Sequence, residues 1–114
     1  MIRVLIWNEF RHEQHKQEVK EIYPEGIHKA IAGFLSDNKD MVIKTATLDE
    51  PEHGLTEEVL ADTDVIIWWG HAFHDLVSDE AAERVVRHIR CGMGGVFLHS
   101  AHYAKPFKIL MGTT

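Results

Sequence analysis

The stretch DVIIWWGHAFHD, residues 64–75, begins as an apolar run and ends in a segment with two histidines and an aspartate. Its first half is short and rich in β-branched and aromatic residues, which predicts a strand buried on both faces. Three other runs have the same character, at 2–7, 41–48 and 94–100. Strands buried on both faces are typical of a parallel sheet, so the histidines of this stretch are expected just beyond a strand end.

Helical patterns alternate with the four predicted strands. Pro24 suits the first turn of a helix, and the residues after it are apolar every three or four positions. Thr56 and Ser78 are typical N-caps for two further helices. The predicted helices cover four segments: 24–38, 57–62, 78–91 and 103–111. This alternation predicts one α/β domain over residues 1–114, with a flavodoxin-like doubly wound parallel sheet, helices on both faces and strand order 2-1-3-4. The polar run 11–21 is expected to be mainly solvated.

Composition excludes several classes of protein. The formal net charge of −6 argues against a nucleic-acid partner or an anionic membrane. The lone Cys91 excludes an internal disulfide and fits a cytoplasmic protein. No signal peptide is expected after Met1, and no apolar run is long enough to span a membrane. The glycines of GMGG, residues 92–95, precede a strand, whereas a phosphate-binding loop follows one, so no nucleotide cofactor is predicted.

Histidine is unusually frequent, with nine in 114 residues. Six of the nine lie in segments that follow the first, third and fourth predicted strands. In an open parallel sheet, ligands bind beyond the carboxyl ends of the strands. With strand order 2-1-3-4 these three segments are neighbours, so the sequence predicts a histidine-rich site at one edge of the sheet.

Three kinds of chemistry fit such a site. A divalent metal, most naturally zinc, takes imidazole and carboxylate ligands. General acid–base catalysis needs a histidine beside a carboxylate such as Glu9 or Asp75. Nucleophilic catalysis is the third, because Ser100 lies at a strand-to-helix turn between two histidines, although no G-x-S-x-G motif is present. The candidate residues are, for catalysis, Glu9, His12, His99 and Ser100; for metal binding, His71, His99 and His102; for substrate binding, Asn8, Trp69, Gly70 and Tyr103.

Structural roles compete with each of these assignments. A single histidine is more often a surface residue or a structural hydrogen-bond partner, and this applies most to His15, His28, His53 and His88. Trp68 and Trp69 are adjacent in a strand, so their side chains point to opposite faces of the sheet. Both are expected to pack under helices, with one of them lining a pocket as the alternative.

The motifs resemble those of the trehalose-utilisation (ThuA-like) family. The resemblance covers essentially the whole chain and rests on four segments: WNEFRHE (7–13), TATLDEPEHGLTEEVLADTDV (45–65), IWWGH (67–71) and LHSAH (98–102). It implies a fold related to the class I glutamine amidotransferases, a sugar or sugar derivative as ligand, and a role in the metabolism of trehalose or a related sugar. A non-catalytic sugar-binding or regulatory module is the alternative.

Three departures from related proteins matter, two in single residues and one in the length of the chain. His99 occupies the position of the amidotransferase cysteine, so the chain is not expected to be a cysteine-dependent glutamine amidotransferase. Ala101 replaces a glycine usual in the family, which would strain the backbone if that position needed a positive φ. Family members are usually longer, and the chain resembles their N-terminal half. A half-sheet exposes an apolar edge, which predicts a homo-oligomer, or an inactive fragment of limited stability.

Overall fold

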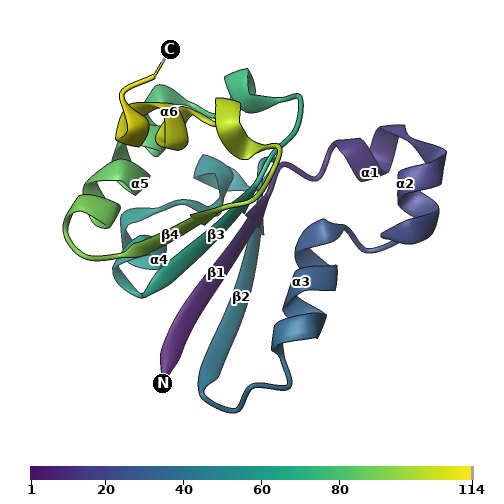
Figure 1. The fold of residues 1–114 in the computed structure, drawn as a ribbon, viewed down its shortest axis with the longest axis horizontal. Coiled ribbons are helices and arrows are strands. Elements are labelled where there is room, and N and C mark those ends of the chain that lie inside the picture. The colour runs from purple at the N-terminus through teal and green to yellow at the C-terminus, as the bar shows by residue number, and fades with distance from the viewer. Residues whose placement is uncertain (114) are drawn as a thin grey trace.

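Four parallel strands form one sheet in the computed structural model, which describes residues 1–113 (Figure 1). The strands are β1 (Ile2–Asn8), β2 (Met41–Thr47), β3 (Val65–Trp69) and β4 (Gly94–Phe97). Their order is β2-β1-β3-β4, and each neighbouring pair is parallel. The predicted doubly wound α/β fold and strand order are therefore confirmed, and the segments after β1, β3 and β4 lie side by side at one edge.

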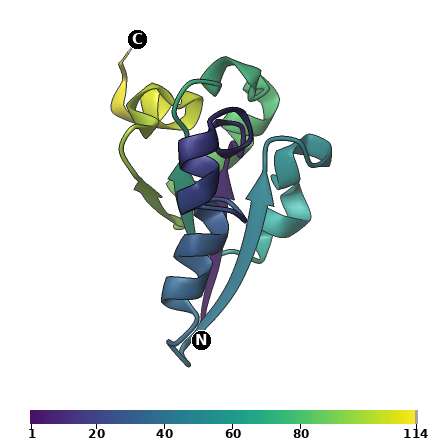
Figure 2. The same ribbon diagram turned by 90° about the vertical axis from the view of Figure 1, so that its right-hand side faces the viewer.

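Helices lie on both sides of this sheet. They are α1 (His12–His15), α2 (Gln17–Ile22), α3 (Ile27–Leu35), α4 (Glu57–Ala61), α5 (Asp79–Arg90) and α6 (Lys105–Met111). Three short 3₁₀ turns cover Pro51–Gly54, His74–Leu76 and Ala101–Tyr103. Helix α3 packs against β1 and β2, while α5 packs with α4 and α6 away from α3 (Figures 1 and 2). Among residues 1–113, no helix is long and apolar enough to cross a membrane.

The two predicted N-caps are confirmed. Thr56 Oγ1 accepts a hydrogen bond from the Val59 N–H, and Ser78 Oγ accepts one from the Ala81 N–H, each at the start of a helix. Such caps satisfy N–H groups that the first helical turn leaves unpaired. The capping residues therefore fix where α4 and α5 begin.

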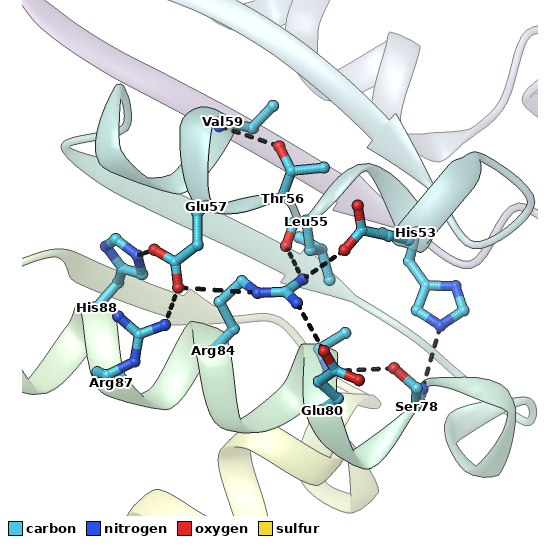
Figure 3. A network of polar contacts seen from close by, with 12 residues as sticks. His53, Leu55, Thr56, Glu57, Val59, Ser78, Glu80, Arg84, Arg87 and His88 are labelled. Carbon is cyan, nitrogen blue, oxygen red and sulfur yellow. Dashed lines mark hydrogen bonds and ion pairs between the residues drawn. The ribbon is translucent and has the colours of Figure 1, made fainter.

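Arg84 ties α5 to the segment before α4 (Figure 3). Its guanidinium donates to the Leu55 carbonyl at 2.8 Å and lies 3.3 Å from a Glu80 oxygen and 3.4 Å from a Glu52 oxygen. The Arg84 side chain is only 12% exposed, so these partners replace water around a largely buried charge. Glu57 extends the cluster by pairing with His88 at 2.9 Å.

The core lies mainly between the sheet and α5. Trp7 and Trp68 stack with ring centroids 4.0 Å apart, and both are 1% exposed. Ile66 points to the same side as Trp68 and is also fully buried. Trp68 therefore packs as predicted, whereas Trp69 points the other way and is only partly buried.

Some predicted boundaries are wrong. The run 11–21 is mainly exposed, as predicted, but it forms the helices α1 and α2, which were not predicted. Helix α3 begins at Ile27, not at residue 24. Strand β4 ends at Phe97, not at residue 100; the Leu98 N–H still donates to the Trp68 carbonyl, but His99 and Ser100 turn away from the sheet. The shorter strand places Ser100 at the turn into the next segment.

Candidate functional site

His71 is the centre of a polar cluster at the carboxyl edge of the sheet. Its Nδ1 lies 2.7 Å from Ser100 Oγ, which joins the segment after β3 to the turn after β4. The His12 ring approaches from α1, with its centroid 4.9 Å from that of His71. The predicted meeting of the three histidine-bearing segments is thus confirmed for this trio of side chains.

Trp69 forms one wall of the cluster. Its ring lies nearly parallel to that of His71, at an interplanar angle of 12° and a centroid separation of 6.1 Å. Its indole Nε1 donates to the His99 carbonyl at 3.0 Å, which fixes the ring against the turn after β4. Trp69 is partly exposed, and its ring centroid lies 6.1 Å from that of His71 and 6.4 Å from that of His12.

Glu9 holds the segment that carries His71. Its carboxylate accepts backbone hydrogen bonds from His71 at 2.8 Å, Ala72 at 3.0 Å and Phe73 at 3.1 Å. The residue is 1% exposed, so three N–H groups replace the water that a buried carboxylate loses. In this structure the side chain positions the loop; its predicted role in catalysis stays a prediction.

Gly70 makes the close approach of Glu9 possible. A Cβ at this position would lie 3.2 Å from a Glu9 carboxylate oxygen and 3.2 Å from Nδ1 of His74. Gly70 is itself buried. It therefore leaves room for the anchoring carboxylate, and its predicted contact with substrate stays a prediction.

A buried polar group lies beside Glu9 on the chain. Asn8 is fully buried, and its amide nitrogen donates to Glu13 at 2.7 Å and to Nδ1 of His28 at 3.0 Å. Glu13 also accepts from the Ile27 N–H at 2.8 Å, which fixes the start of α3. Asn8, predicted to bind substrate, thus uses its amide inside the protein. The sequence suggested Glu13 as a carboxylate partner of the histidines, whereas in the structure its carboxylate accepts from Asn8 and from the backbone of Ile27.

Burial decides the state of His28. It is 4% exposed, and burial lowers its pKa below the ordinary value, although Glu13 acts in the opposite direction. A neutral ring with an unprotonated Nδ1 can accept the Asn8 amide hydrogen bond. His28 is therefore a structural histidine, as predicted for a residue away from the strand ends.

His99 and His102 form a separate pair next to the cluster. Their rings stack at a centroid distance of 5.5 Å, and the Tyr103 ring lies 4.4 Å from that of His102. The rings of His99 and His102 are both exposed. The predicted catalytic role of His99 and the predicted substrate contact of Tyr103 stay predictions.

Metal binding requires several donors at one point. Over residues 1–113, no group of three or more histidine, cysteine, aspartate or glutamate side chains is arranged to hold a metal ion. His71 pairs with His12, while His99 pairs with His102, so the three predicted zinc ligands do not converge in this arrangement.

His74 contacts the backbone of the loop that carries His71. Its Nε2 lies 3.0 Å from the His71 carbonyl, and its ring is 6.4 Å from that of Tyr103. Burial lowers the pKa of His74, while the charge of Glu9 acts to raise it. His71 and His74 are thus the two ends of a turn in which the imidazole of His74 contacts the backbone of His71.

Ala101 does not need the conformation of a glycine. Among residues 1–113, positive φ outside glycine occurs at Phe10, Glu52 and His53. Ala101 begins a 3₁₀ turn and is 1% exposed within the core. Its methyl group is thus buried without backbone strain.

Comparison with known proteins gives the family. No curated protein matches the chain. The family model named ThuA and described as trehalose utilisation matches residues 3–114, which include all of β1 except Ile2, the strands β3 and β4, and the His71 cluster. The chain belongs to the ThuA family, for which a role in trehalose utilisation is described.

Proposed function

We propose that this protein binds trehalose or a related sugar at the His71 cluster, and that the His71 imidazole acts there as a general base that takes the proton of a sugar hydroxyl and returns it as the product forms. The observation that carries the proposal is the 2.7 Å contact between His71 Nδ1 and Ser100 Oγ, because it joins a titratable base to a hydroxyl at the ligand-binding edge. Family membership supports the choice of sugar.

Each side chain of the cluster has a distinct part. The His71 imidazole accepts the proton, and Ser100 fixes its orientation. We assign to His12 the exchange of a proton with bound substrate or water, and the 4.9 Å between its ring centroid and that of His71 supports this. The partly exposed face of Trp69 can pack against the C–H face of a sugar ring, since aromatic rings combine apolar contact with a polar edge.

A second candidate is a binding module without turnover. The backbone N–H groups of His71, Ala72 and Phe73 all donate to Glu9. They are therefore not free to stabilise a developing negative charge on a substrate, which is usually the largest single contribution to catalysis. This observation favours sugar binding over chemistry that builds an oxyanion.

Zinc or another divalent ion at His71, His99 and His102 stays a prediction. Elemental analysis of the untagged protein, beside a His71→Ala, His99→Ala double variant, tests it. Near-stoichiometric metal in the wild type that is lost in the double variant would support the metal site. A metal-free wild type would contradict it. The cytoplasmic location expected from Cys91 also stays a prediction.

Sugar binding and turnover are separable by experiment. Saturation-transfer NMR with trehalose and glucose measures binding, and ¹³C NMR of labelled sugar measures conversion. We expect Trp69→Ala to weaken binding, and His71→Gln and Ser100→Ala to abolish conversion while binding persists. His88→Gln is a matched control, because His88 contacts Glu57 on α5 and lies outside the cluster.

The outcomes distinguish the two functions. Binding without conversion in the wild type supports the binding module. Conversion that survives both His71→Gln and Ser100→Ala contradicts the acid–base proposal. If neither trehalose nor glucose binds, both the acid–base function and the binding module are contradicted.

A further inference from the structure

Helix α1 carries His12 but has little of its own to hold it in place. It has four residues, and a helix this short is not stable by itself in water. The structure describes every residue of α1 and α2, and Glu13 is the only buried one among them. An exposed ion pair between Arg11 and Asp49 adds a tie at the surface. The position of His12 therefore depends mainly on what binds Glu13 and on the turn that leads into α1.

Asn8 is at the centre of the hydrogen bonds that hold this segment. Its amide nitrogen donates to Glu13 Oε2 at 2.7 Å and to Nδ1 of His28 at 3.0 Å. Its Oδ1 accepts the Phe10 N–H at 3.0 Å. Glu13 Oε2 also accepts from the Ile27 N–H, while Oε1 has no hydrogen-bond partner in the described part of the chain. Loss of the Asn8 bond would thus leave the buried carboxylate with Ile27 alone.

The turn into α1 is itself constrained. Phe10 has φ 51°, in the left-handed region that residues other than glycine seldom adopt. Its N–H is held by Asn8, and its ring meets that of His28 edge-on, with centroids 4.9 Å apart. A strained backbone of this kind persists only when the contacts around it over-determine it. Asn8 and His28 therefore hold the turn that directs α1 toward the His71 cluster.

The polarity of these bonds fixes the state of His28. A backbone N–H can only donate, so Oδ1 of Asn8 faces Phe10 and the NH₂ of Asn8 faces the imidazole. Nδ1 of His28 must then accept, whereas both nitrogens of an imidazolium donate. Turning the amide over would place its NH₂ against the Phe10 N–H and its oxygen against the Glu13 carboxylate. A protonated His28 thus leaves Asn8 no arrangement that keeps all three bonds.

Charged groups face His28 from three segments. Glu13 on α1 and Glu50 in the turn after β2 act to raise its pKa. Burial is the largest influence and lowers the pKa, as does Lys29 on α3, and the net shift is downward. The neutral ring that the network requires is therefore the form present at neutral pH.

We propose that Asn8, Glu13 and His28 position His12 against His71, and that uptake of a proton by His28 releases α1 and moves His12 away. His28 is thus a positioning residue that acts on the site through Asn8 and Glu13. The inference deepens the proposed function and rests on it for the role of His12 in proton exchange. The arrangement of the two rings can be tested with no sugar present.

Histidine ring NMR of the sugar-free 114-residue chain, between about pH 7.5 and about pH 5 where imidazoles titrate, tests the proposal. The nuclear Overhauser effect between ring protons of His12 and His71 reports their contact, since the ring centroids lie 4.9 Å apart. The chemical shifts of the His28 ring protons report its protonation. We expect the Overhauser effect to be lost as His28 becomes protonated. It should persist over the same range in His28→Gln, because a glutamine oxygen can accept from Asn8 and does not titrate.

Repulsion between His12 and His71, when both become charged, is the competing cause of such a loss. It acts equally in the wild type and in His28→Gln. A contact that is lost at the same pH in both proteins would therefore overturn the proposal. A contact that persists in the wild type after His28 is protonated would also overturn it. His15→Gln is the matched control, because His15 is an exposed histidine of the same helix, and it should behave like the wild type.

Amide hydrogen exchange provides a measurement that needs no variant. The amides of Phe10 and Ile27 donate to Asn8 and Glu13, so their protection factors should fall across the His28 titration. The protection factor of Leu5 in β1 should stay constant, which excludes general unfolding. Unchanged protection at Phe10 and Ile27 would overturn the proposal even if His28→Gln did not fold. Neither measurement uses a sugar, so failure here and failure of the proposed function are separate results.

Discussion

Replacement of Glu9 by alanine removes the anchor of the loop that carries His71. Three backbone N–H groups, those of His71, Ala72 and Phe73, lose a shared carboxylate acceptor. A hydrogen bond to a charged group contributes about 1.5–3 kcal/mol, but His71 and Ala72 are exposed and water can replace part of the loss. We therefore expect the free energy of unfolding to fall by about 3 kcal/mol.

Glutamine at position 9 should cost less. One oxygen of Glu9 accepts from His71 and Ala72, and the other accepts from Phe73. A glutamine keeps the first pair if its oxygen takes that place, but its NH₂ then faces the Phe73 N–H. The expected loss is about 1.5 kcal/mol, from one lost charge-assisted bond and a weaker acceptor.

Urea denaturation followed by tryptophan fluorescence measures both losses, since Trp7 and Trp68 are buried together in the core. Amide hydrogen exchange gives a local readout, and exchange at Ala72 should accelerate in both variants. Glu58→Ala is the control, because Glu58 is an exposed residue of α4. A loss for Glu9→Ala within about 0.5 kcal/mol of this control, the range of ordinary surface substitutions, would refute the anchoring role.

Three further predictions concern elements that support the fold. Burial lowers the pKa of His28 in the folded protein. Its contribution to the free energy of unfolding is therefore fully present above the unfolded pKa of about 6.5 and is lost as the pH falls through the lower folded value. His28→Gln should flatten this pH dependence, as measured by urea titrations at several pH values. Arg84→Met leaves the Leu55 carbonyl without its donor and should cost about 1–3 kcal/mol in thermal unfolding. Ser78→Ala removes the cap on the Ala81 N–H and should cost about 1 kcal/mol in urea denaturation.

Matched controls separate these effects from general damage. His15→Gln alters an exposed histidine and should leave the pH dependence as in the wild type. Arg90→Met removes an exposed arginine of α5 and should change stability by less than about 0.5 kcal/mol. Equal losses for Arg84→Met and Arg90→Met, or an unchanged pH dependence in His28→Gln, would contradict the assigned roles.

The strands could be predicted from the sequence alone. Apolar runs such as 64–69 predict buried strands because burial on both faces leaves no polar alternation, and the helices between them require parallel pairing. Order β2-β1-β3-β4 then brings the histidine segments together. The short α1 and α2 were missed, because neither leaves a periodic apolar pattern. Helix α1 is held by buried hydrogen bonds of Glu13, and α2 has no buried residue.

The sequence alone determined the fold class, the strand order and the edge at which the polar residues gather. Only the tertiary structure decided which of them face one another: His71 meets Ser100 and His12, His99 stacks on His102, and Glu9 turns inward to the backbone. The physical reason is that periodicity records which residues are buried. The pairing of side chains in neighbouring loops depends on turn geometry and on how each buried polar group is satisfied, and neither leaves a local pattern in the chain.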